Sequence, residues 1–577
     1  MIALLFCGAF ITKAQQPSMT LPVMYINTEN GQEITSREDY INATYYLESN
    51  SEEFESFGSP SEPLPLEIRG RGNWTWEGFD KKPYKIKLGK KTALLGMNKS
   101  KHFALLAHAD DELGFLRNTA GFELSRRLGL PWTPGQQPVE LVLNGDYKGL
   151  YFLTENIRVE ETRVNIVEQA DNIDDPEAIK GGWLVEIDNY DKDPHITVAE
   201  GNGAIIWFTY KTPEVLSAKQ EQYLQDEMEK VDRAIYSTNK NSTLWEEYVD
   251  LDQLIRFYIV QEILDNAESF HGSCFLYKDL DETKWKFGPV WDFGNTYRRY
   301  DQMFIYERPP YGQIWIAEMA KFPHFQERLK KVWEEFLGYG YDGLEKYLSE
   351  FVEGVQTAAR SDANRWPIYG NQNIIKDYNT FIEKLHNRIT WLGRQWGATI
   401  DFGETPQPSP DPNPEGKTIY LRGYFNGWGL DNPFEKKKDG LYYITNISFE
   451  DAFKIADSEW GEINLGSNGS PIYVGEKYIL VRGTNENIIP AQKFENVDFV
   501  VDLNEPSVTI RPTGTVGIDA VTKEEIAVTG REIRADGRIV VYDFRGIKLQ
   551  EGRDRLRIEG TGPRIIVTER GSLKHTF

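Results

Sequence analysis

The sequence predicts an α+β protein whose main part is followed by two smaller all-β parts. Three observations predict this organisation: strand-like alternation fills the first half of residues 21–401, helical patterns fill its second half, and alternation with frequent turns returns after residue 417. Strands that come first and helices that follow are typical of α+β folds rather than of alternating parallel ones. At 577 residues the chain is too long for one core, so several domains are expected.

The composition is that of a globular protein with a strongly acidic balance. Hydrophobic residues make up 40% of the chain, charged residues 27%, and the formal net charge is −24. Binding to nucleic-acid phosphates needs a dense cationic face, so this charge argues against a nucleic-acid partner. After the first residues, no stretch has the ~18 uncharged apolar residues that a membrane span needs. We therefore expect a soluble or surface-held mature protein without a transmembrane segment.

The first residues have the pattern of a secretory signal. The stretch "MIALLFCGAFITKAQQ" carries an apolar run followed by the small residue Ala14, which predicts a signal peptide over residues 1–14. It lacks a basic start, so either the true start lies upstream or the signal is weak, and a buried N-terminal helix is the alternative. Cys7 would leave with the signal and Cys274 would be the only thiol left, which excludes an internal disulfide. The predicted location is secreted or at the cell surface or outer membrane, with the periplasm as the alternative.

Two strands rich in basic residues open the main part. In "PLEIRGRGNWTW" and "KKPYKIKLGKK" every second residue is apolar, which predicts strands with one buried face. If these strands pair, Arg69, Arg71, Lys85 and Lys87 share the other face. The sequence therefore predicts a cationic face on this part of the fold.

A hairpin and several helices follow. "VELVLNGDYKGLYFLTENI" joins two apolar runs at Asn144-Gly145, a pair typical of a tight hairpin turn. "FLRNTAGFELSRRLGLP" has helical spacing and should end at Gly129. "LDQLIRFYIVQEILDN" (residues 251–266) and "FQERLKKVWEEFLGYG" are helical by the same criterion.

The tail is separated from the main part by a proline-rich stretch. "FGETPQPSPDPNPEGK" cannot bury apolar surface, which predicts an extended linker over residues 402–416. Residues 417–512 alternate like a β-sandwich, and residues 513–577 like a short all-β domain.

The histidines do not favour a zinc site. The seven histidines show neither i,i+4 pairs nor cysteine neighbours. His102 and His108 lie near the acids 110–112, and we interpret this segment as a solvated polar loop. Any metal in this chain would prefer oxygen ligands.

One acid, in "GPVWDFGNTY", lies between two aromatic residues. A charge in such a place is costly unless something pairs with it, so Asp292 indicates either a buried salt bridge or a bound metal ion. The end of the helix 251–266 supplies Asn266 and Glu268, and a hairpin returning through "KWKFGPVWDFG" would bring Asp292 beside them. Oxygen ligands around a divalent cation, opposite arginines and lysines, suit phosphoryl transfer. Pairing of the hairpin acids with Lys284 or Lys286 is the alternative.

Residues from Leu21 to about Gly397 resemble the CotH-type family of secreted kinases, which are similar to spore coat protein H. The resemblance is carried in order by "LPVMYINTENGQEITSREDYINATYYL", "IRGRGNWTWEGFDKKPYKIKL", "LLGMNKSKHFALLAHADDELGFLRNTAGFELSRRLGLPWTP", "VELVLNGDYKGLYFLTENI", "GGWLVEID" and "KWKFGPVWDFG". It implies an atypical protein-kinase-like domain over residues 21–401 that uses ATP and Mg²⁺ to phosphorylate proteins.

The resemblance also implies roles for particular residues. Asp292 matches the metal-binding aspartate of the family, with Asn266 and Glu268 assisting, and Glu268 is the candidate base. By analogy with ordinary kinases, Glu155 would orient a lysine. The implied contacts to the nucleotide phosphates are Arg71, Lys82, Lys85 and Lys87.

The chain departs from the family pattern at two positions. Asn266-Ala-Glu268 stands where the family usually has Asn-x-Asp, and Gly294 stands where it often has a second acid after Asp292. A reacting group displaced by ~1 Å can lose about a hundredfold in rate. The site is therefore that of an altered kinase, a kinase with a different acceptor, or a pseudokinase that binds nucleotide only.

The sandwich resembles starch-binding domains of outer-surface glycan-uptake lipoproteins. "YLRGYFNGWG" and "AFKIADSEWGEINLG" carry the resemblance. Trp428 and Trp460 are the candidate glycan-binding residues because flat aromatic rings stack on sugar faces, and Lys454 is a candidate hydroxyl partner. The alternative is that Trp428 fills the sandwich core or shapes a turn.

The last residues resemble a sorting domain of the type IX secretion system. "GRIVVYDFRGIKLQEGRDRLRIEGTGPRIIVTERGSLKHTF" carries this resemblance, which implies recognition by export machinery. A small accessory β-domain is the alternative.

Together these patterns predict an exported atypical kinase that transfers the ATP phosphoryl group to Ser or Thr of a protein acceptor and carries a module for α-glucan or another glycan. The alternative is a catalytically altered pseudokinase that acts as a surface scaffold for glycans or cell-surface partners.

Overall fold

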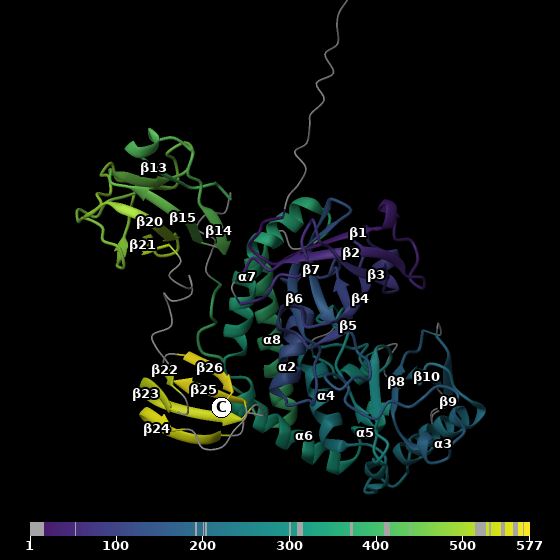
Figure 1. Cartoon of the computed structure of the whole chain (residues 1–577). Helices are drawn as coiled ribbons and strands as arrows, with labels where there is room; N and C mark the ends of the chain where they lie inside the picture. The colour runs from purple at the N-terminus through teal and green to yellow at the C-terminus, as the bar shows by residue number, and fades with distance from the viewer. Residues whose placement is uncertain are drawn as a thin grey trace, which may run out of the picture. The chain divides into compact units, whose positions relative to one another are not determined.

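The computed structural model describes residues 17–576, apart from 52, 191–192, 200, 202–204, 299–301, 309–314, 370–372, 409–415, 439, 514–526, 530–531, 544–547, 558–562 and 569–570. The predicted signal peptide and much of the predicted linker lie outside the described residues. The described chain forms two compact units (Figure 1). The larger contains the residues up to Lys417 together with Glu435–Tyr442, and the smaller contains Thr418–Phe434 and the residues from Tyr443 onward.

A closed β-barrel forms the first half of the larger unit (Figure 1). Parallel pairing of β1 with β6 closes the barrel, and its interior is a separate apolar core. The strand order is β1-β2-β3-β4-β5-β7-β6. The strands are β1 (Val23–Thr28), β2 (Ile41–Glu48), β3 (Leu64–Gly70), β4 (Tyr84–Thr92), β5 (Ser100–Leu106), β6 (Gln136–Leu143) and β7 (Asp146–Glu155).

Two predictions about this barrel are confirmed. The basic strands β3 and β4 pair antiparallel, and Arg69 lies opposite Lys85. The hairpin between β6 and β7 turns at Asn144 and Gly145, whose φ angles are 52° and 77°. Positive φ at both central residues is what a tight hairpin turn of this kind requires, and Asn-Gly adopts it readily.

The second half of the larger unit combines a sheet with helices around one continuous apolar core, so the predicted α+β class is confirmed. The sheet has the order β12-β11-β8-β10-β9. Its strands are β8 (Trp183–Ile187), β9 (His195–Ala199), β10 (Ile205–Thr212), β11 (Cys274–Lys278) and β12 (Lys286–Phe287). The helices of the unit are α1 (Trp74–Glu77), α2 (Leu116–Arg127), α3 (Ala218–Ile235), α4 (Leu251–Ile263), α5 (Trp315–Met319), α6 (Pro323–Glu335), α7 (Leu344–Arg365) and α8 (Ile374–Trp396).

Helix α7 is fastened to the barrel by a buried ion pair. Nζ of Lys81 lies 2.7 Å from Oδ1 of Asp362, and both side chains are 1% exposed. The same carboxylate oxygen accepts a hydrogen bond of 2.9 Å from the backbone N–H of Leu150 in β7. This ion pair therefore joins the barrel to the helical half, and both of its charged groups are shielded from water.

The smaller unit begins with two sheets that meet through aromatic side chains. Phe453 of the first sheet packs against Phe449, Phe494 and Phe499 of the second. Within this unit the sheet orders are β13-β16-β17-β19 and β15-β20-β21-β18. Its strands are β13 (Tyr420–Gly423), β15 (Leu441–Phe449), β16 (Phe453–Ala456), β17 (Asn464–Gly466), β18 (Lys477–Ile479), β19 (Val481–Arg482), β20 (Phe494–Asp502) and β21 (Ser507–Pro512). Strand β14 (Glu435–Lys438) belongs to the larger unit.

The described residues after 526 are also strands. They form a sheet in the order β22-β23-β25-β26, with β24 paired to β23. Their bounds are β22 (Ala527–Thr529), β23 (Glu532–Asp543), β24 (Lys548–Arg557), β25 (Pro563–Thr568) and β26 (Gly571–Thr576). No helix in the described part of the chain combines the length and the apolar character needed to cross a bilayer.

Candidate active site

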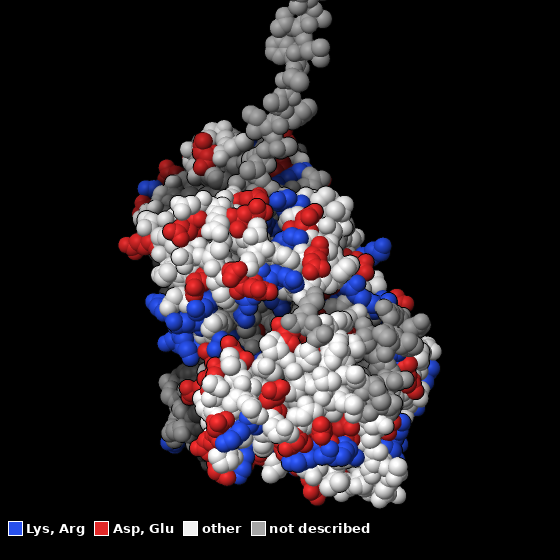
Figure 2. Space-filling model, turned by 90° about the vertical axis from the view of Figure 1, so that its right-hand side faces the viewer, with Lys and Arg blue, Asp and Glu red and all other residues white. Residues whose placement is uncertain are grey.

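A cleft of about 1330 Å³ in the larger unit is lined by four of the predicted site residues. Arg71 follows β3 and Lys85 lies in β4, so both come from the barrel. Glu268 follows α4 and Asp292 follows β12, so both come from the second half of the unit. Figure 2 views the molecule from the side of β8 and β10 and shows basic side chains gathered across the middle of this face.

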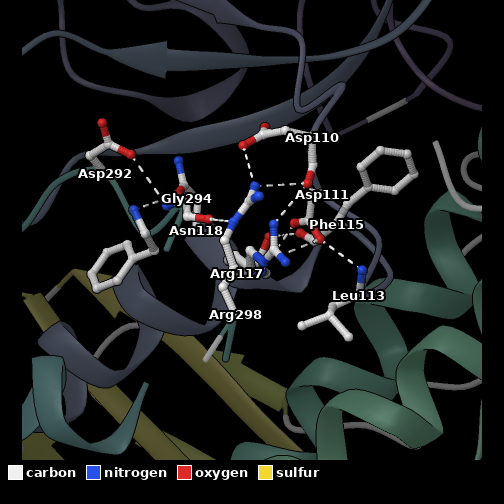
Figure 3. A network of polar contacts seen from close by, with 11 residues as sticks. Asp110, Asp111, Leu113, Phe115, Arg117, Asn118, Asp292, Gly294 and Arg298 are labelled. Atoms are coloured by element: carbon white, nitrogen blue, oxygen red, sulfur yellow. Dashed lines mark hydrogen bonds and ion pairs between the residues drawn. The ribbon is translucent and has the colours of Figure 1, made fainter. Parts of the chain in front are cut away.

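Asp292 presents an exposed carboxylate to this cleft. Its backbone is in the left-handed region, with a φ of 53°, and its Oδ1 accepts a hydrogen bond of 3.2 Å from the backbone N–H of Gly294 (Figure 3). Among the described residues, no Lys or Arg lies within ion-pair distance of it. Lys286, one of the alternative partners, pairs with Glu282 instead. The buried salt bridge considered for this acid is therefore not formed between described residues.

Asn266 reaches the backbone of Asp292 rather than its carboxylate. The side chain is fully buried, and its Nδ2 donates to Oε1 of Gln261 at 2.9 Å and to the carbonyl oxygen of Asp292 at 3.0 Å. Asn266 is not among the residues that line the cleft. The structure thus brings Asn266 and Asp292 together through the main chain.

Glu268 lies in the cleft close enough to Asp292 for their charges to interact. Burial raises the pKa of the Glu268 carboxyl, and the negative charge of Asp292 raises it further. Glu268 accepts hydrogen bonds from the hydroxyl of Tyr190 and from Nδ2 of Asn295. The negative charge of Asp292 thus disfavours the ionised form of Glu268, and a cation between the two side chains would relieve this repulsion.

These carboxylates fit a Mg²⁺ ion that a nucleotide helps to hold. In the described part of the chain, no cluster of three or more His, Cys, Asp or Glu could hold a metal ion by itself. Mg²⁺ in nucleotide sites is usually bound by one or two carboxylates together with phosphate oxygens and water. Glu268 and Asp292 supply that number of carboxylates in the lining of the cleft.

Two cations of the cleft have no ion-pair partner among the described residues. No Asp or Glu within the described ranges lies within ion-pair distance of Arg71 or Lys85. Burial, together with the neighbouring charges of Arg69, Arg71 and Arg158, lowers the pKa of Lys85 to about 8. The pKa of Arg71 is also lowered by burial, which the charge of Asp292 partly offsets. Such a cluster favours a multiply charged anion in the cleft.

Three other predicted residues do not line the cleft. Nζ of Lys82 donates to the carbonyl oxygen of Trp76 at 2.6 Å, and Lys87 forms an ion pair of 2.7 Å with Glu67. Glu155 is fully buried and accepts hydrogen bonds from the backbone N–H groups of Asn98 and Gly135, at 2.7 and 2.8 Å. Among the described residues, these hydrogen-bond partners of Glu155 include no lysine.

The segment before α2 contributes residues that sequence reasoning missed. Asp111 is 2% exposed, and its Oδ1 accepts a hydrogen bond of 2.8 Å from the N–H of Leu113. Its Oδ2 accepts one of 3.3 Å from the N–H of Arg117 in the first turn of α2. The interpretation of this segment as a solvated loop is therefore wrong, because its acids order a buried helix start. Asp110 lines the cleft and forms an ion pair of 2.7 Å with Arg298 (Figure 3). Two successive acids a few residues before a helix were the available signal.

Gly294 lies between two of these acids. A Cβ atom built at this position would lie 3.2 Å from Oδ1 of Asp292 and 3.6 Å from Oδ2 of Asp110. An acidic side chain at position 294 would thus begin next to the carboxylate of Asp110.

Glu186 is a further acid in the wall of the cleft. It lies in β8, and its Oε2 is 3.0 Å from Nζ of Lys211. Burial raises the pKa of Glu186 to about 7, although Lys211 opposes this shift.

The smaller unit contains an aromatic cluster made by Tyr424, Trp428 and Trp460. The ring centroids of the two tryptophans are 5.9 Å apart, and that of Tyr424 lies 5.2 Å from Trp428. Both tryptophans are half-buried with positive φ, 61° and 57°, a costly backbone conformation for bulky residues. Arg422 stacks 3.9 Å from the ring centre of Trp460. Nζ of Lys454 donates to the carbonyl oxygen of Thr484.

Comparison with known proteins gives one family. The family model described as CotH kinase protein matches residues 68–392, which is more than half of the chain and includes all the cleft residues named above. No curated protein matches the chain.

Proposed function

The chain belongs to the CotH kinase family, and from this membership and the cleft we propose that it is an atypical protein kinase. It binds ATP with Mg²⁺ and transfers the terminal phosphoryl group to a Ser or Thr hydroxyl of a protein acceptor. The observation that carries the proposal is that Arg71 and Lys85 line the same cleft as Glu268 and Asp292. Phosphoryl transfer depends on cations around the phosphates and on carboxylates that hold the metal ion.

The cations and the carboxylates of the cleft have different roles. Arg71 and Lys85 bind the phosphates, because they are the described Lys and Arg residues of the cleft lining that have no carboxylate partner. Asp292 and Glu268 hold the metal ion, and Mg²⁺ when bound neutralises the phosphate oxygens. In the transfer, the acceptor oxygen bonds to the γ-phosphorus, the bond from that phosphorus to the bridging oxygen of ADP breaks, and the hydroxyl proton passes to Glu268. Burial, the largest cause of the raised pKa of Glu268, supports its role as proton acceptor.

A pseudokinase is the alternative within the same cleft. The contacts that Tyr190 and Asn295 make with Glu268 favour it, because they occupy the carboxylate that would accept the proton. Such a protein would bind nucleotide and Mg²⁺ without transfer, and would act as a scaffold.

Two measurements on the full chain separate these outcomes. The first is the shift in melting temperature on adding ATP with Mg²⁺, and the second is transfer of label from γ-labelled ATP to the protein itself and to model proteins. We expect both signals, and we expect Asp292→Ala to abolish both. The control is Asp281→Ala, which removes an exposed acid outside the cleft lining. A shift without transfer supports the pseudokinase, and the lack of both signals ends the nucleotide proposal.

We further propose that the aromatic cluster of the smaller unit binds glycan. Two observations support this role. The ring of Tyr424 is exposed beside two tryptophans, and both tryptophans have a costly backbone conformation. Retardation of the full chain in gels containing α-glucan tests it. Trp428→Ala and Tyr424→Ala should remove the retardation, whereas Tyr473→Ala should keep it, since Tyr473 is an exposed ring outside the cluster. Equal retardation of all three variants would end the proposal.

Export to the cell surface is a proposal supported by sequence patterns alone, the signal-like residues 1–14 and the sorting-like residues 513–577. Export machinery would then be a partner of the C-terminal region. Cell fractionation of the full chain and of a variant lacking residues 513–577 tests this. Equal distribution of the two proteins would overturn it.

A further inference from the structure

The peptide group between Asp292 and Phe293 is held at both ends by buried asparagine side chains. At one end, Nδ2 of Asn266 donates to the carbonyl oxygen of Asp292 at 3.0 Å. At the other end, the N–H of Phe293 donates to Oδ1 of Asn118 at 3.2 Å. Asn118 lies in α2 and Asn266 follows α4, so residues from two separate elements form hydrogen bonds with one peptide group (Figure 3 shows the Asn118 side). The two side chains are 7% and 0% exposed.

This peptide group needs external support because of the backbone around it. Asp292 has a φ of 53°, and left-handed conformations cost L-residues roughly 1–2 kcal/mol. The side chain of Asp292 is exposed, so packing does not hold it, whereas its neighbour Phe293 is fully buried. Rotation of the peptide group would change the backbone angles of Asp292 and turn its carboxylate away from the cleft.

We propose that Asn118 and Asn266 are positioning residues that clamp this peptide group and thereby aim the Asp292 carboxylate at the bound cation. The proposal rests on the proposed function and deepens it, because it assigns to Asn266 a role different from that of a metal ligand. Each asparagine does this with one defined atom. Asn118 uses an oxygen as acceptor, and Asn266 uses a nitrogen as donor.

The opposite polarity of the two contacts gives the test. Asn→Asp replaces the amide nitrogen by oxygen, so the acceptor at position 118 is kept and the donor at position 266 is lost. A metal ligand at position 266 would instead use an oxygen, which Asn266→Asp keeps and charges. The two roles thus predict opposite results for the same substitution.

Hydrogen exchange on the nucleotide-free full chain tests the clamp without any ligand. Exchange of the Phe293 amide should become at least about tenfold faster in Asn118→Leu and stay within about threefold of the parent in Asn118→Asp. The amides of β11 serve as the internal reference. An unchanged Phe293 amide in Asn118→Leu would overturn the clamp. If that variant does not fold, Asn118→Ser, which is too short to reach, gives the same comparison.

The Mg²⁺ concentration that gives half of the ATP-induced thermal shift, measured at pH 8, tests the link to the cation. We expect Asn266→Asp to need about tenfold more Mg²⁺ and Asn118→Asp to behave like the parent protein. If Asn266→Asp needs no more Mg²⁺ than the parent protein, residue 266 acts as a metal ligand and the positioning role is overturned. If the parent protein shows no shift with ATP, the proposed function fails, while the exchange result still decides on the clamp.

Discussion

Nη2 of Arg298 lies 2.7 Å from Oδ2 of Asp110, and this ion pair fastens the turn after Asp292 to the segment before α2. The same guanidinium donates through Nε to the carbonyl oxygen of Gly294. Its positive charge also lowers the pKa values of Asp110 and Glu268, against the larger effect of burial. Arg298 is thus a tethered cation among the acids that would hold a metal ion.

Removal of this tethered cation should strengthen Mg²⁺ binding. Arg298→Gln leaves Asp110, Glu268 and Asp292 without its charge, so a metal ion meets less competition. We expect the Mg²⁺ concentration for half of the ATP-induced thermal shift to fall by about three- to tenfold. The control is Arg328→Gln, which breaks the pair with Asp252 outside the cleft lining. A rise in the Mg²⁺ requirement would show instead that Arg298 serves the nucleotide.

Gly121→Ala should destabilise the protein although it improves helix propensity. A Cβ at position 121 in α2 would lie 2.2 Å from the Phe293 ring, which is fully buried. Overpacking of this kind costs about 1–3 kcal/mol, more than the ~1 kcal/mol that Ala gains over Gly in a helix. Gly354→Ala in α7 is the matched control, because nothing lies within 4 Å of a Cβ there. Chemical denaturation should show loss of stability for the first variant and gain for the second.

Nucleotide binding should weaken as the pH rises above 8. Burial and neighbouring cations lower the pKa of Lys85 to about 8, so the free protein loses this charge between about pH 7 and 9. Phosphates favour the charged form, and binding therefore takes up a proton in this range. Calorimetry in buffers of different ionisation enthalpy measures that uptake. The Lys85→Arg variant stays charged, so it should show neither the proton uptake nor the loss of affinity. Proton uptake in that variant would show that a group other than Lys85 takes up the proton.

Glu186 should make the protein less stable as the pH rises from about 4.5 to 7. Its pKa is raised from 4.5 to about 7, so between these values the folded state binds more protons than the unfolded state, and the free energy of unfolding falls with rising pH. Glu186→Gln should remove about 1–3 kcal/mol of this pH dependence. Urea denaturation at pH 5 and pH 8 measures it. The exposed Glu177, replaced by Gln, should leave the pH dependence as in the parent protein.

The buried pair of Lys81 and Asp362 should cost more to break than to replace. Asp362→Ala leaves a buried ammonium without its partner and removes the acceptor of the Leu150 N–H, so we expect a loss of about 3–5 kcal/mol. The double variant Lys81→Met with Asp362→Leu leaves no uncompensated charge and should lose clearly less. Equal losses for the two proteins, measured by denaturation, would mean that the charge itself is unimportant.

Local features of the fold were readable in the sequence because short-range chemistry decides them. Asn144-Gly145 marks a turn that few other pairs can form, and the alternation around Ile68 and Ile86 marks strands with one buried face. Closure of the barrel was not readable, since β1 pairs with β6 more than 100 residues later. Nothing in either strand identifies that partner.

The candidate site was readable to a similar extent. The path from α4 through the hairpin brings Glu268 near Asp292, as the residue spacing indicated. Lys82 was placed with Lys85 because both are basic and neighbouring, but Lys82 lies before β4 and turns to Trp76. Asn118 and Asp110 were missed because they meet the Asp292 loop through tertiary contacts that span more than 170 residues.

Because β1 bonds to both β2 and β6, every strand of the N-terminal barrel has a neighbour on each side. The barrel therefore offers no edge on which a strand from another molecule can extend the sheet. Any self-association through that half of the larger unit therefore has to use side-chain contacts. Substitutions on the outer faces of the strands can remove such contacts without disturbing the backbone hydrogen bonds of the barrel.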